Sequence, residues 1–60
     1  MEFWIAREIL GNLYLYNTEP YLDGEEWNSK GNYYLIDKHL FTEVTFENSP
    51  QMVEIKLVKE

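Results

Sequence analysis

The chain has 60 residues, no cysteine and one histidine, and eleven acidic residues against five basic ones give it a formal net charge of −6. This composition excludes disulfides and thiolate metal sites, and it argues against direct binding to nucleic acid or to an anionic membrane, which both rely on lysine and arginine. We expect one small domain, residues 1–60, in the cytoplasm, because residues 1–10 carry charges and lack the apolar stretch of a signal peptide.

The first third of the chain predicts a β-hairpin. Residues 2–9 alternate as in a β-strand, with Ile5 and Arg7 on one face and Trp4 on the other. Residues 13–17 repeat this alternation with leucines and tyrosines. The Gly-Asn pair between the two segments is typical of a tight turn, so we expect the two strands to pair.

The middle of the chain is acidic and less regular. Pro20 ends the second strand, and residues 19–26 predict a loop, followed by a short strand over residues 26–28 and a turn over residues 29–32. Three interpretations of the acidic loop remain open: a solvated loop, a weak site for a divalent cation, and a contact for a basic partner. Its carboxylates are Glu19, Asp23, Glu25 and Glu26.

The last part of the chain predicts two or three further strands. Residues 33–36 alternate clearly, and Asp37 is suited to cap a short helical turn just after them. Residues 43–47 are a candidate strand, and residues 51–59 give the cleanest alternation. The lysines that close this last strand are typical of an exposed sheet edge.

These elements predict a mostly β fold. We expect a small antiparallel meander or half-open barrel of about five short strands, with one short helical turn near residues 37–42. The alternative is an α+β domain with a short helix over residues 37–43. A β-domain of this length is not expected to enclose a pocket of a few hundred Å³.

Ten aromatic residues are more ring surface than one small core readily hides. Rings at alternate positions of the first two strands share a face, and either Tyr33 or Tyr34 joins them, depending on the strand register. Such rings either support the core or form a surface for a protein, a second copy or a small ligand. The candidate interaction surface is Trp4, Tyr14, Tyr16 and Tyr34.

No residue pattern predicts catalysis, a cofactor or a metal site. His39 is the single histidine and lies on an expected surface turn, while Ser29 and Ser49 lie in turns without a histidine nearby in the sequence. The three glycines are isolated, so there is no glycine-rich phosphate loop. We therefore expect a protein that is not an enzyme.

Several segments are familiar in combination: residues 3–7, residues 13–16 ahead of Pro20, Ile36-Asp37, and residues 40–50 leading into residues 53–55. Together they cover most of the chain and resemble a group of small uncharacterised proteins from gut anaerobes and their phages and mobile elements. The sequence departs from the group at Thr42, where proline is expected, and at Phe46, where tryptophan is expected. The resemblance implies a phage or mobile-element setting and no activity.

The sequence favours a small acidic protein-interaction module. Its partner is an unidentified protein or a second copy, bound through the aromatic sheet face or through the edge of the last strand. The alternative is an acidic decoy from a phage or mobile element that occupies the basic surface of a host nucleic-acid-binding protein. A decoy requires carboxylates arrayed along one edge or face.

Overall fold

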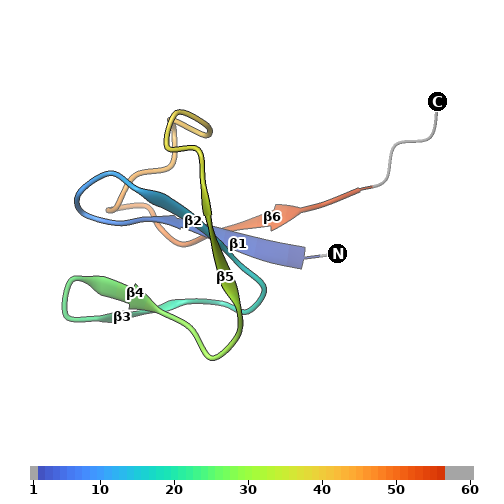
Figure 1. Ribbon diagram of the computed structural model, residues 1–60, viewed down its shortest axis with the longest axis horizontal. Coiled ribbons are helices and arrows are strands. Elements are labelled where there is room, and N and C mark those ends of the chain that lie inside the picture. The colour runs from blue at the N-terminus through green and yellow to red at the C-terminus, as the bar shows by residue number, and fades with distance from the viewer. Residues whose placement is uncertain (1, 57–60) are drawn as a thin grey trace.

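A computed structural model describes residues 2–56 and consists of β-strands joined by turns and loops (Figure 1). In chain order the strands are β1 (Glu2–Arg7), β2 (Leu13–Tyr16), β3 (Tyr21–Asp23), β4 (Glu26–Asn28), β5 (Tyr33–Ile36) and β6 (Gln51–Glu54). Four of them form an antiparallel sheet in the order β5-β2-β1-β6, and β3 pairs with β4 in a separate hairpin. The sheet does not close into a barrel, so the prediction of a mostly β, half-open fold is confirmed.

The segment after Asp37 forms one hydrogen-bonded turn and does not extend into a helix: the Leu40 backbone N–H donates to the Asp37 carbonyl (3.0 Å), and the His39 N–H donates to Asp37 Oδ1 (2.9 Å), so Asp37 caps the turn as expected. The strand predicted over residues 43–47 is wrong. Residues 43–47 lie in loop and turn structure. The side chain of Asn48 accepts from the Thr45 N–H and donates to the Glu43 carbonyl, so these backbone groups bond within the segment and not with a neighbouring strand.

The acidic segment expected to be a loop contains β3. Asp23 pairs with Glu26, so the hairpin turn consists of Gly24 and Glu25, and Gly24 at its first position adopts φ 67°, a backbone region that favours glycine. Tyrosine and leucine before this turn and tryptophan after it favour strand structure. The last strand starts at Gln51 as predicted, but β6 ends at Glu54, so residues 55 and 56 of the predicted strand lie beyond it. Residues 57–59 of that prediction lie outside the described residues.

The main hydrophobic cluster lies on one face of the four-stranded sheet, which we call the core face, while Ala6 and Tyr16 are buried on the opposite face. Ile5 of β1 and Leu13 of β2 are buried on the core face against Val44, and three partly buried residues surround them: Leu15, Ile36 and Val53. Val44 belongs to residues 37–50, which connect β5 at one edge of the sheet to β6 at the other edge. This connection covers the core face, so it replaces the second sheet that a β-sandwich would use.

Arg7 holds the connection against the sheet. Its side chain lies on the core face, and its guanidinium group donates five hydrogen bonds, all to backbone carbonyl oxygens. Four acceptors belong to the connection between β5 and β6, and the fifth is the carbonyl of Gly11 in the β1–β2 turn. The acceptors are the carbonyls of Gly11, Lys38, Leu40, Phe41 and Val44.

Side chains complete the backbone hydrogen bonding of Arg7. Strand β6 pairs with Glu2–Ile5 and does not extend to Arg7. The Arg7 N–H donates instead to Ser49 Oγ (2.9 Å), and its carbonyl accepts from Trp27 Nε1 (3.1 Å). The bond from Trp27 attaches the β3–β4 hairpin to β1, and the Trp27 ring also lies 6.2 Å from the ring of Phe46.

A polar network joins the β2–β3 turn to the β4–β5 turn. Asn17 and Asn32 exchange two hydrogen bonds, and the Gly31 N–H donates to Thr18 Oγ1 and Ser29 Oγ. A Cβ atom on residue 31 would lie 2.1 Å from Asn17 Oδ1, so this close approach requires glycine. The network therefore fixes where the β3–β4 hairpin leaves the sheet and returns to it.

Candidate functional site

The strand register assigns the aromatic residues to faces. Trp4 lies opposite Tyr16, and Tyr16 lies opposite Tyr33, so these three residues and Tyr14 share the face opposite the core face, which we call the aromatic face. Tyr34 pairs with Leu15 and therefore lies on the core face. The register therefore places Tyr33, and not Tyr34, on the face of Tyr14 and Tyr16. The expected interaction surface, which included Tyr34, is corrected on this point.

Three tyrosines form a compact ring cluster on the aromatic face. The ring centroids are 6.4 Å apart for Tyr14 and Tyr16, 5.9 Å for Tyr14 and Tyr33, and 6.1 Å for Tyr16 and Tyr33. Their interplanar angles of 47°, 72° and 36° correspond to tilted and edge-to-face arrangements. Such arrangements are favourable for aromatic pairs, so the three rings stabilise one another's positions.

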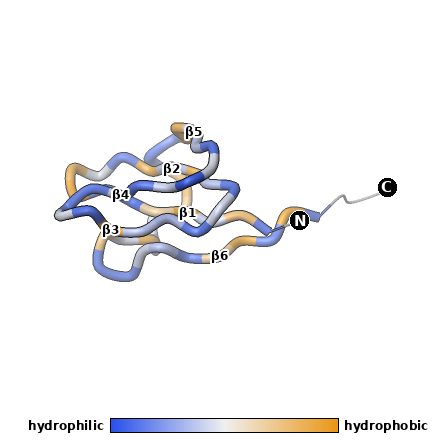
Figure 2. The backbone as a smooth tube through the Cα atoms, turned by 90° about the horizontal axis from the view of Figure 1, so that it is seen from below, coloured by the Kyte–Doolittle hydropathy of each residue, from blue (hydrophilic) through white to orange (hydrophobic). Residues whose placement is uncertain are grey.

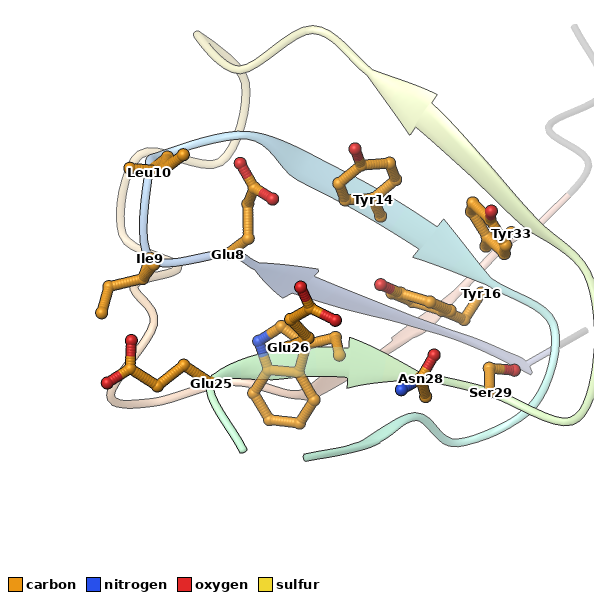
Figure 3. A pocket seen from close by; sticks show the side chains of 11 residues that line it. Glu8, Ile9, Leu10, Tyr14, Tyr16, Glu25, Glu26, Asn28, Ser29 and Tyr33 are labelled. Carbon is orange, nitrogen blue, oxygen red and sulfur yellow. The ribbon is translucent and has the colours of Figure 1, made fainter. Parts of the chain in front are cut away.

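This ring cluster forms one side of a pocket of about 400 Å³, which has the size that so small a domain was not expected to enclose but is partly open to solvent (Figure 3). The β1–β2 turn and β4 supply the other sides. Figures 1 and 2 show the β3–β4 hairpin beside the end of the sheet that holds the β1–β2 turn. The lining residues are Glu8, Ile9, Leu10, Tyr14, Tyr16, Glu25, Glu26, Trp27, Asn28, Ser29 and Tyr33.

The pocket combines rings with carboxylates. Glu8 comes from the end of β1, and Glu25 and Glu26 come from the hydrophilic tip of the β3–β4 hairpin (Figure 2). Glu8 accepts one hydrogen bond from Asn12 Nδ2 (2.7 Å). Within residues 2–56 the single ion pair joins Lys56 to Glu54, so no described cation pairs with the three pocket carboxylates.

Tyr16 is the most buried ring of the pocket, with only 3% of its surface exposed. In Figure 3 its hydroxyl points into the pocket, on the side toward Glu8 and Glu26. None of the hydrogen bonds among residues 2–56 includes this hydroxyl. Burial, followed by the nearby groups of Tyr14, Tyr33 and Glu8, raises the pKa of Tyr16 to about 12.

The raised pKa of Tyr16 predicts a loss of stability at alkaline pH. An unfolded tyrosine loses its proton near pH 10, whereas folded Tyr16 keeps it to about pH 12, so the folded state binds more protons in this interval. The free energy of unfolding should therefore fall between pH 10 and 12, by about 2 kcal/mol from this residue. Urea unfolding at several pH values measures the decline, and Tyr16→Phe should flatten it. An equal decline in the variant would contradict the assignment.

The other residues considered from the sequence are not brought together. His39 is exposed. Ser29 lines the pocket and bonds with Thr18, and Ser49 bonds with the Thr45 carbonyl and the Arg7 N–H. In residues 2–56 no group of three or more histidines, aspartates or glutamates is arranged to hold a metal ion, including the acidic segment. No helix in the same residues has the length and apolar character needed to cross a membrane.

Sequence reasoning missed the part of the pocket built by the β3–β4 hairpin. It treated Glu25 and Glu26 as an acidic loop and left Glu8 outside any site. The Asp-Gly turn signal was present in the sequence, but the position of the hairpin beside the aromatic face depends on the bond from Trp27 to Arg7. Comparison with protein-family models, with curated proteins and with solved structures finds no match to the chain.

Proposed function

We propose that this chain is a small non-catalytic protein-interaction module that associates with a second copy of itself through the edge of β5. The observation that carries the proposal is the exposed apolar character of this edge strand. Tyr33, Tyr34 and Leu35 expose 63%, 52% and 66% of their surface, although they are consecutive residues of a strand. No strand of residues 2–56 pairs with the outer side of β5.

Edge pairing between two copies suits β5 better than β6. An edge strand presents unpaired backbone N–H and C=O groups, and an antiparallel pair of β5 strands would satisfy both copies by the same contact. The four residues of β5 carry no charge, so pairing brings no like charges directly opposite each other. Glu54 of β6 and the following Lys56 carry charges, which commonly protect an edge strand from pairing.

Self-association should appear as a rise in solution mass with protein concentration. The net charge of −6 on each copy opposes association, so high salt should strengthen it by screening this repulsion. Light scattering over a concentration series at low and high salt measures the effect. A mass that stays monomeric at high salt and high concentration would reject the proposal.

Matched lysine variants identify the edge. Leu35→Lys should give a monomer, because an exposed lysine on an edge strand disfavours pairing. Met52→Lys introduces the same side chain at an exposed position of β6 and should leave the association unchanged. If Met52→Lys abolishes the dimer and Leu35→Lys does not, β6 is the contact edge.

A second candidate function is the acidic decoy for a basic host protein. The three pocket carboxylates, which no described cation neutralises, favour it. Against an extended decoy, Glu2 and Glu54 lie opposite each other on β1 and β6, away from the carboxylates around the pocket. The decoy hypothesis is therefore limited to a local acidic site at the pocket. Binding of a basic partner to this site would weaken at high salt.

A further inference from the structure

We propose that the pocket on the aromatic face binds the guanidinium group of an arginine from a partner protein. This inference goes beyond self-association through β5 and does not depend on it. It rests on three features that meet in one pocket of about 400 Å³: tyrosine rings, carboxylates that form no ion pair within residues 2–56, and a tyrosine hydroxyl that is accessible from the pocket and has no hydrogen-bond partner in those residues.

The tyrosine cluster provides faces on which a flat cation can stack. A guanidinium group within about 6 Å of a ring centroid is attracted by the negative face of the ring, more strongly where water is excluded. Tyr14, Tyr16 and Tyr33 lie within 6.4 Å of one another, so one cation can contact more than one of them. The tilted rings offer both faces and edges to the flat group and to its aliphatic stem.

The carboxylates provide the charge that selects a cation. Figure 3 shows the carboxyl group of Glu26 on the side of the pocket toward which the Tyr16 hydroxyl points, and the carboxyl group of Glu8 on the side of Leu10 and Tyr14. Because no lysine or arginine of residues 2–56 forms an ion pair with either carboxylate, a cation that enters meets unneutralised negative charge. A guanidinium group can donate two parallel hydrogen bonds to one carboxylate, a geometry that an ammonium group cannot match.

The hydroxyl of Tyr16 gives the pocket a specific polar group. Only 3% of the surface of Tyr16 is exposed, and its hydroxyl points into the pocket without a hydrogen-bond partner among the described residues. A hydroxyl can accept from an N–H of the guanidinium group and donate to a carbonyl oxygen of the same ligand. A metal ion is a poorer occupant, because residues 2–56 lack a group of three or more ligands arranged to hold one.

The test uses short peptides, blocked at both ends, with one central arginine between glycines. Nuclear magnetic resonance titration should show shifts at Tyr14, Tyr16 and Glu26 that saturate with the arginine peptide. A peptide with citrulline, which keeps the shape and removes the charge, should bind about tenfold more weakly, and high salt should weaken the arginine peptide. The proposal would be overturned if the citrulline peptide, or a peptide with lysine at the central position, bound as tightly as the arginine peptide. It would also be overturned by shifts confined to residues outside the pocket, or by no binding at all.

Two variants and one control separate the pocket from general negative charge. Tyr16→Phe removes only a hydroxyl without a partner, so the fold should persist, while the arginine peptide should bind about three- to tenfold more weakly. Glu26→Gln should have a similar effect. Glu43→Gln changes the net charge by the same amount at an exposed residue outside the pocket and should leave binding unchanged. Equal losses in Glu26→Gln and Glu43→Gln would overturn the proposal.

Discussion

Arg7→Ala is expected to lower the free energy of unfolding by about 3 kcal/mol or more, because one side chain satisfies five backbone carbonyls. Four of these acceptors lie in the connection that covers the core face, so their loss frees the segment that carries Val44. A core of this size rarely supplies more than about 3–5 kcal/mol, and the variant should therefore be largely unfolded. Urea unfolding followed by tryptophan fluorescence measures the change.

Two substitutions control the interpretation. Arg7→Lys keeps the charge but has three donors on one nitrogen atom, so it should recover less than half of the lost stability. Lys56→Ala removes an exposed cation whose single ion-pair contact with Glu54 is 4.0 Å long, and it should be nearly silent. If Arg7→Ala unfolds at the same urea concentration as Lys56→Ala, the carbonyl contacts do not stabilise the fold.

Alternation along the chain was sufficient to predict β1, β2 and β5 and to divide their residues between two faces. Ile5 and Trp4 point in opposite directions as expected, and Arg7 shares the face of Ile5. The role of Arg7 was not predictable from this pattern, because its acceptors lie 4 to 37 residues away and are backbone carbonyls. Carbonyls carry no sequence signal, since every residue has one.

The aromatic face shows where local patterns stop being sufficient. Tyr33 and Tyr34 are adjacent rings, and a shift of one residue in the pairing exchanges their faces. Only the register with β2 assigns Tyr33 to the pocket. The acidic half of the pocket depends on a longer-range fact, the attachment of the β3–β4 hairpin to β1 by Trp27, which neither charge nor periodicity encodes.

Residues 37–50 illustrate the same limit for the core. The short apolar run around Leu40 and the Asp37 cap favoured a helical turn, but a helix there would compete with the bonds from Arg7 to the carbonyls of Lys38, Leu40 and Phe41. Those long-range bonds take the place of helical ones. The conformation of this segment is therefore determined by its hydrogen bonds to Arg7 of the sheet and not by its local sequence.

Leu13→Ala is the second large effect we expect, with a loss of about 2–5 kcal/mol in the free energy of unfolding. Leu13 is 0% exposed and packs against Ile5 and Val44, so the truncation leaves a cavity at the contact between the sheet and the covering segment. In this chain the cavity cannot be refilled readily, because the covering segment is held by Arg7 and has little freedom to collapse. We therefore expect the upper half of that range, measured by urea unfolding.

Leu10→Ala is the matched control for this substitution. Leu10 belongs to the same β1–β2 hairpin and loses the same atoms, but it is 87% exposed, so the free energy of unfolding should change by less than about 0.5 kcal/mol. Equal shifts of the urea midpoint in the two variants would contradict the placement of the core on the Ile5 face. Leu10 lies in the β1–β2 turn and lines the pocket, so a large loss for Leu13 alone would show that the loss comes from the core contact of Leu13 with Ile5 and Val44.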